Sequence, residues 1–224
     1  MNERDRHLVC TAMASLGPRT SGAVLFDADS TQFVRMNLVL LKGLLEDKGL
    51  EGIFITVDRP HQYMAHLLRM HQVSMDRLAF IDAIGRLSGD QKEAPARAGY
   101  VDAPFHIDSL PDTIAEMHSG EIPGIDVDKV DFVMIDNLAA LLPFNSYAAV
   151  EAFVNKFISV MTARWNALVP MVVDRERNGL LYDTVLSRAD DAISLREPLG
   201  LEGTSASGKG RMTISGTRYR GVNP

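Results

Sequence analysis

The feature that most constrains the fold is a continuous apolar run, Phe132 to Ile135, that leads directly into Asp136 and Asn137. A run in which every residue is apolar is typical of a strand buried on both faces, as in a parallel sheet. Asp136 would then lie at the carboxyl end of that strand, where open α/β sheets bind their ligands. The sequence therefore favours an α/β fold with functional residues along one edge of the sheet.

Four other short apolar runs repeat this arrangement. We expect strands at residues 22–26, 52–57, 78–81 and 169–173, which end at Asp27, Asp58, Asp82 and Asp174. Helical patterns are found at residues 3–16, 33–48, 61–72 and 146–168. Strands that alternate with helices at this spacing predict βαβ units and a mostly parallel sheet.

The end of the chain departs from this pattern. Residues 192–195 and 211–215 have the character of two strands around a Gly- and Ser-rich loop, which predicts a C-terminal antiparallel hairpin. The expected organisation is an N-terminal helix in residues 1–20, an α/β core in residues 21–200, and a loop, closing strand and basic tail in residues 201–224.

Composition excludes several classes of protein. The 224 residues are 46% hydrophobic, which predicts one domain with a sizeable core, and the net charge of -6 argues against a nucleic-acid partner. The single cysteine, Cys10, cannot form an intrachain disulfide and fits a reducing compartment. No apolar run approaches the roughly 20 residues of a membrane span, and the N-terminus lacks the features of a signal peptide. We expect a cytoplasmic protein with no membrane contact.

The strand-end aspartates would crowd one edge of a parallel sheet. Two carboxylates about 5 Å apart repel by roughly 3 kcal/mol at an effective dielectric constant of about 20. A divalent cation, protonation or arginines could relieve this repulsion. Arginines close to these acids in sequence are Arg35, Arg59, Arg86, Arg175 and Arg177. The alternative is that each aspartate caps the helix that follows its strand.

Several segments resemble the KaiC-like branch of the RecA-type P-loop ATPases. Residues 52–60 resemble the second strand of that family, which ends with a catalytic acid and a proline. Residues 130–147 are similar to its Walker B strand and the start of the next helix, and residues 186–195 and 211–219 resemble its late strands. The resemblance runs from residue 22 to about residue 219 and implies a RecA-like three-layer sandwich with a mostly parallel central sheet.

The same resemblance implies a site for ATP and magnesium. Asp136 takes the Walker B role of holding the magnesium water shell, and Asp58 takes the role of activating water. The phosphate-binding loop of the family has the form G-x-x-x-x-G-K-[ST], because bare backbone amides must wrap the phosphates. The matching residues 27–35 contain no glycine and no lysine and add two negative charges. Ser30, Thr31 and Arg35 are what remains of a phosphate-binding position.

These features support three functions. The leading hypothesis is a KaiC-like domain with a degenerate phosphate loop that acts as a regulatory or scaffolding protein, with itself or an active KaiC-like relative as its partner. The second is an ATP-binding protein or weak ATPase that uses Asp136, Asp58 and Arg35. The third is a magnesium-dependent phosphatase of the haloacid dehalogenase-like type, because Asp27-x-Asp29-x-Thr31 resembles the first motif of that family.

A second glycine-rich segment matches the phosphate-loop pattern only in part. Residues 203–209 end in Gly-Lys, but Gly210 stands where the pattern requires Ser or Thr. The segment also lies between two expected antiparallel strands instead of between a buried strand and a helix. We expect a flexible turn there.

Overall fold

The computed structural model describes residues 1–84, 98–100, 107–117, 126 and 129–196. A seven-stranded sheet has the order β4-β3-β2-β5-β6-β1-β7. The strands are β1 (Gly22–Asp27), β2 (Gly52–Thr56), β3 (Leu78–Asp82), β4 (Ala98–Tyr100), β5 (Phe132–Ile135), β6 (Leu168–Val173) and β7 (Asp191–Ser194). All neighbouring strands are parallel, so their carboxyl ends lie along one edge.

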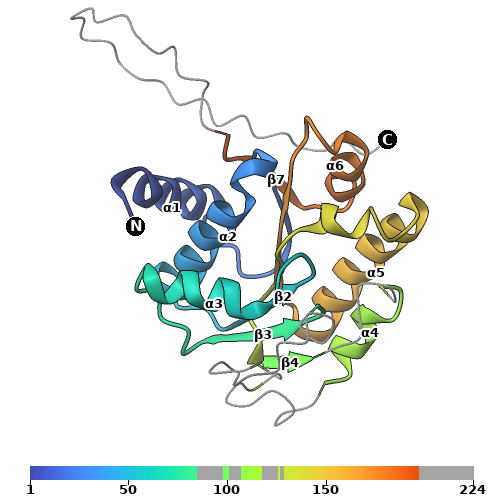
Figure 1. Cartoon of the computed structure of the whole chain (residues 1–224), viewed down its shortest axis with the longest axis horizontal. Helices are drawn as coiled ribbons and strands as arrows, with labels where there is room; N and C mark the ends of the chain where they lie inside the picture. Colours follow the sequence, from blue (N-terminus) through green and yellow to red (C-terminus); the bar gives the residue numbers. More distant parts are fainter. Residues whose placement is uncertain (85–97, 101–106, 118–125, 127–128, 197–224) are drawn as a thin grey trace, which may run out of the picture.

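Helices cover both faces of the sheet (Figure 1). One layer consists of α1 (Glu3–Leu16), α2 (Phe33–Lys42) and α3 (His61–Met70), and the other of α4 (Leu110–Ala115), α5 (Tyr147–Trp165) and α6 (Gly179–Leu186). Shorter helical turns are η1 (Ser30–Gln32), η2 (Gly43–Asp47) and η4 (Leu138–Leu141). The α/β sandwich therefore has the three layers expected from the sequence.

The strands are apolar throughout because both faces are buried. In β2, Ile53 and Ile55 pack with residues of α4 and α5, whereas Phe54 between them packs with residues of α2 and α3. The same alternation places Leu25 of β1 on the α5 side and Phe26 on the α2 side. Side chains of a strand point alternately to opposite faces, so a sheet covered on both sides requires an unbroken apolar run.

The C-terminal antiparallel hairpin is not confirmed. Its first expected strand is β7, which pairs in parallel with β1 and places Val24 opposite Asp191. Helix α6 precedes β7 and returns the chain to the amino edge of the sheet, so β7 enters in the same direction as β1. Residues 211–215, the second expected strand, lie outside the described residues. Within the described part of the chain, no helix has the length and apolar character needed to cross a membrane.

Candidate functional site

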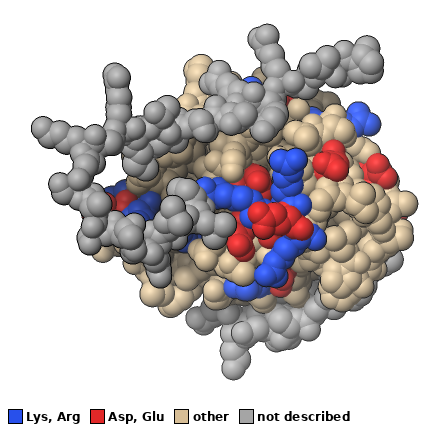
Figure 2. Space-filling model, turned by 90° about the horizontal axis from the view of Figure 1, so that it is seen from above, with Lys and Arg blue, Asp and Glu red and all other residues tan. Residues whose placement is uncertain are grey.

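The strand-end aspartates lie along the carboxyl edge of the sheet, where they form separate groups. Basic and acidic side chains gather at the centre of this face of the molecule (Figure 2). Asp82 belongs to neither group described below, because its Oδ2 accepts a hydrogen bond from the backbone N–H of His61 at 2.9 Å. Asp82 therefore bonds to the start of α3, a helix that precedes β3 in the chain, and this differs from the capping of the following helix considered for these acids.

The first group joins the ends of β1, β6 and β7 through Arg196. The Nε of Arg196 donates to both carboxylate oxygens of Asp27 at 3.0 Å, and its Nη2 donates to Oδ1 of Asp174 at 2.6 Å. The carboxylates of Asp27 and Asp174 therefore share one guanidinium. The hydrogen bond to Asp27 raises the pKa of Arg196, so this cation stays charged.

The backbone N–H groups of the turn after β1 donate hydrogen bonds to aspartate side chains of the same chain. The backbone N–H of Ser30 donates to Oδ2 of Asp174 at 2.8 Å, and the N–H and hydroxyl of Thr31 donate to Oδ1 of Asp29 at 2.8 and 2.7 Å. Burial alone would raise the pKa of Asp174, but the hydrogen bonds from Ser30 and Arg196 outweigh it and lower that pKa to about 2. The hydrogen bond from the Thr31 hydroxyl lowers the pKa of Asp29.

Arg35 makes a contact with the N-terminal helix. Its Nε donates to Oδ1 of Asp5 at 2.7 Å, which links α2 to α1. The resemblance to the KaiC-like branch placed Arg35 near the lysine position of the phosphate loop. In the structure, its Nε bonds to a carboxylate of the neighbouring helix α1. Ser30 and Thr31 lie in η1, five and four residues before Arg35, and their backbone N–H groups donate to Asp174 and Asp29.

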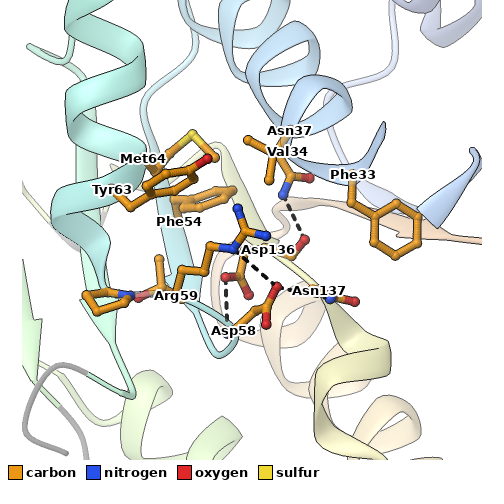
Figure 3. Close-up of a pocket in the computed structure, with 12 residues that line it drawn as sticks. Phe33, Val34, Asn37, Phe54, Asp58, Arg59, Tyr63, Met64, Asp136 and Asn137 are labelled. Carbon is orange, nitrogen blue, oxygen red and sulfur yellow. Dashed lines mark hydrogen bonds and ion pairs between the residues drawn. The ribbon is translucent and has the colours of Figure 1, made fainter. Parts of the chain in front are cut away.

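The second group is formed by Asp136 and Asp58 (Figure 3). The carboxylate of Asp136 accepts hydrogen bonds from the backbone N–H groups of Val57 at 2.9 Å and of Asp58 at 3.2 Å. Burial raises the pKa of Asp136 to about 7, although these two hydrogen bonds act to lower it. Asp136 therefore joins the end of β5 to the end of β2, as a carboxyl group that is partly protonated near neutral pH.

Asp58 is more open to solvent and has polar neighbours. Its Oδ2 accepts a hydrogen bond from Nδ2 of Asn137 at 3.3 Å and lies 3.8 Å from Nε of Arg59. The side chain of Asp58 is 38% exposed. The structure therefore brings together Asp58 and Asp136, the two acids assigned to the Walker B and water-activating roles.

The side chains around Asp136 include few further metal ligands. Among the described residues, no group of three His, Cys, Asp or Glu side chains is placed to hold a metal. Both oxygens of Asp136 accept backbone hydrogen bonds, and burial raises its pKa, so this carboxyl must lose its proton when it binds a hard cation. The assignment of Asp136 to magnesium stays a prediction.

Sequence reasoning missed Arg196 and Asn37. Arg196 follows β7 at the same edge where the other strands end in acids, so a basic residue at that position was a usable signal. Asn37 lies inside α2, where its Nδ2 donates to the backbone carbonyl of Asp136 at 2.7 Å. No local pattern marks Asn37, because its partner is 99 residues away.

No protein-family model matches the chain, and a search of curated proteins finds no relative. Solved structures do match. The uncharacterized protein PH0321 from Pyrococcus horikoshii, in complex with an unknown peptide, has a TM-score of 0.60 and 14% sequence identity, over 86% of each chain. The two chains share a fold.

Two further solved structures share this fold. The KaiC-like protein PH0186 from Pyrococcus horikoshii has a TM-score of 0.53 at 12% identity and covers 81% of this chain and 74% of its own. The flagellar accessory protein FlaH from Methanocaldococcus jannaschii has a TM-score of 0.51 at 11% identity and covers 86% and 76%. The resemblance of the sequence to the KaiC-like branch is confirmed at the level of the fold.

Proposed function

We propose that this KaiC-like chain is a cytoplasmic regulatory or scaffolding protein without catalytic activity, which acts through contacts with itself or with an active KaiC-like relative. The observation that carries the proposal is the set of hydrogen bonds after β1, where the Asp174 carboxylate accepts from Ser30 and Arg196. A bound phosphate requires backbone N–H groups and cations as hydrogen-bond donors, and here the N–H of Ser30 and the guanidinium of Arg196 already bond to Asp174.

Charge and length both act against a nucleotide at this turn. Asp29 lies in this turn and Asp27 and Asp174 lie beside it, and Arg196 bridges the latter two, so these four side chains carry a net charge of -2. Each carboxylate about 5 Å from a phosphate charge adds roughly 3 kcal/mol of repulsion at an effective dielectric constant of about 20. Only residues 28–32 separate β1 from α2, whereas the phosphate loop of P-loop ATPases is eight residues long.

Two observations support protein contacts. PH0321, which shares the fold, is seen in complex with a peptide. On this chain, Leu180 of α6 is 70% exposed and Phe144 after η4 is 56% exposed. Large apolar side chains at the surface contribute to association when a partner covers them.

A titration with ATP and magnesium tests the proposal directly. We expect calorimetry on the full chain to detect no binding at millimolar ATP. Micromolar binding that is lost in both Asp136→Asn and Arg35→Ala would overturn the proposal in favour of an ATP-binding protein. Light scattering tests the assembly: a chain that stays monomeric and binds no KaiC-like relative when mixed with one would also contradict it.

The ATPase alternative has one observation in its favour. Asp58 is partly exposed and lies beside Asp136, which is the pairing that a water-activating acid and a Walker B acid require. Release of phosphate from ATP by the wild-type chain, abolished in Asp58→Asn, would support it.

The phosphatase alternative depends on Asp27 as a nucleophile. Both carboxylate oxygens of Asp27 accept hydrogen bonds from Arg196. These bonds reduce the nucleophilicity of the carboxylate toward a phosphate ester. Turnover of p-nitrophenyl phosphate with magnesium that disappears in Asp27→Asn would favour this alternative over the scaffold.

A further inference from the structure

Helix α3 presents a row of apolar side chains to solvent. Tyr63 is 41% exposed and Met70 is 63% exposed, and Leu67 between them is partly buried. Positions i, i+4 and i+7 lie on one face of a helix, so these three side chains form a continuous row. A different face of α3 packs onto the sheet through Met64 and Leu68, which are buried. The row is therefore apolar surface that the packing of α3 leaves exposed.

The charges beside this row are positive. The ten residues of α3 contain no acid, whereas His66 and Arg69 lie on its exposed side. Within the described part of the chain, neither side chain has a hydrogen bond or an ion pair. At the start of the row, Arg59 lies between the Tyr63 ring and Asp58, so its charge is compensated within the chain (Figure 3). Arg69 is thus a cation that remains available to a partner.

A second exposed apolar surface lies where α5 and α6 begin. The hydroxyl of Tyr147 donates to the backbone carbonyl of Leu180 at 2.6 Å, which joins the first turns of the two helices. Leu180 is 70% exposed, and Phe144, three residues before Tyr147, is 56% exposed. Glu151 follows Tyr147 by one turn and Asp183 follows Leu180 by one turn. These five residues are called the α5–α6 surface below.

The charges of the α5–α6 surface are negative. Glu151 and Asp183 are exposed, and neither carboxylate has a hydrogen bond or an ion pair with another described residue. The arginines near this surface have partners within the chain. The Nε of Arg188 donates to Oδ1 of Asn155 at 2.7 Å, and the guanidinium carbon of Arg175 lies 5.5 Å from the centre of a tyrosine ring of α6. The two acids are therefore the charges that a partner can compensate.

The α3 row and the α5–α6 surface are complementary but lie on opposite sides of the sheet (Figure 1). Both are apolar, and their available charges have opposite signs. Because the sheet separates them, they cannot meet within one molecule. Contact of α3 with α3 of another copy would bring like charges together, which is unfavourable. Contact of α3 with the α5–α6 surface of another copy covers apolar side chains on both sides and pairs the charges.

We propose that copies of this chain associate head to tail, with the α3 row of one copy on the α5–α6 surface of the next. Such a contact joins two different surfaces, so each added copy leaves one surface of each kind free at the ends. The assembly then grows until it closes as a ring or continues as a filament. This inference rests on the proposed contacts of the chain with itself, and it names the two surfaces that make them.

Sedimentation equilibrium of the full chain and two variants tests the inference. Met70→Glu adds an acid to the α3 row, where it would face Glu151 and Asp183, and Leu180→Arg adds a cation that would face Arg69. Met70 and Leu180 are exposed, so neither substitution disturbs the core. We expect the wild-type chain to form species larger than a dimer as its concentration rises to about 1 mM, and each variant to weaken association by about tenfold or more.

An equimolar mixture of the two variants is the decisive measurement. Met70→Glu keeps its α5–α6 surface and Leu180→Arg keeps its α3 row, so the mixture contains one intact pair of surfaces. We expect the mixture to associate and to stop at a dimer, at a concentration where each variant alone stays monomeric. Arg4→Glu, on the exposed side of α1, is the control for added negative charge and should associate like the wild type.

Three results would overturn the inference. They are a wild-type chain that stays monomeric at about 1 mM, wild-type association that stops at a dimer, and a mixture that associates no better than the separate variants. A monomeric chain that still binds a KaiC-like relative overturns this interface and leaves the scaffold proposal in place. Micromolar binding of ATP overturns the scaffold proposal and leaves the association measurement unaffected.

Discussion

Arg196 donates from its Nε to both carboxylate oxygens of Asp27, although 169 residues separate the two in sequence. The same guanidinium reaches Asp174 at 2.6 Å. One side chain thus links β7 to the neighbouring ends of β1 and β6. The two carboxylates and the guanidinium carry a net charge of -1, and the shared hydrogen bonds reduce the repulsion between the two acids.

Replacement of Arg196 should destabilise the fold. Arg196→Met leaves Asp27 and Asp174 without their common partner, and we expect the free energy of unfolding to fall by about 2–4 kcal/mol. Arg196→Lys should lose less, because an ammonium keeps the charge but lacks the two-pronged geometry. Urea unfolding measures both. Arg69→Met on the exposed side of α3 is the matched control, and an equal loss in that variant would contradict the assignment.

The lowered pKa of Asp174 predicts a loss of stability in acid. A carboxyl group with a pKa of about 2 in the folded chain and about 3.8 when unfolded stabilises the fold above pH 4. This contribution, about 2 kcal/mol, should be lost as the pH falls from about 4 to 2. Unfolding monitored by circular dichroism over this range should show a shallower pH dependence in Asp174→Asn. A slope identical to that of the wild type would count against the assignment.

The raised pKa of Asp136 predicts that the stability of the fold decreases as the pH rises. Its pKa is raised to about 7 in the folded chain, so the folded state binds a proton more tightly than the unfolded state. Stability should therefore decrease as the pH rises from about 4 to 7 and then level off, with a total effect of up to about 4 kcal/mol. Asp136→Asn cannot ionise and should lose this slope, whatever its absolute stability. Thermal unfolding at half-unit pH steps with chelator present measures the effect.

Gly52 is expected to tolerate no side chain. A Cβ atom at this position would lie 2.3–2.4 Å from ring atoms of Phe132, which is fully buried in the adjacent strand. We expect Gly52→Ala to cost about 1–3 kcal/mol, because β2 or β5 must shift to relieve the overlap. Gly179→Ala is the matched control, since no atom lies within 4 Å of the added Cβ. Chemical unfolding of the pair should give a clear difference, and two equally stable variants would refute the prediction.

The candidate site shows where sequence reasoning succeeds. The resemblance to the KaiC-like branch assigned Asp58 and Asp136 to one site, and the carboxylate of Asp136 accepts a hydrogen bond from the backbone N–H of Asp58 where β2 and β5 end. The reason is that hydrophobic runs are local properties, and parallel strands align their ends at one edge. The role of each acid in a reaction stays a prediction.

The site also shows where such reasoning stops. Arg35 was grouped with Ser30 and Thr31 because they are close in sequence, yet its Nε contacts Asp5 of α1. The arginine that compensates Asp27 is instead Arg196, which no proximity rule selects. Side chains four or five positions apart lie close together only if the backbone between them directs them to the same side.

The α/β class, the five buried strands and the aspartates that follow them were readable from the chain alone, because burial on both faces of a sheet demands unbroken apolar runs. The direction of β7, the shared guanidinium of Arg196 and the hydrogen bond from Asn37 to the carbonyl of Asp136 were decided by the assembled sheet. They depend on which strands become neighbours, and that order emerges only when the helices on both faces pack together.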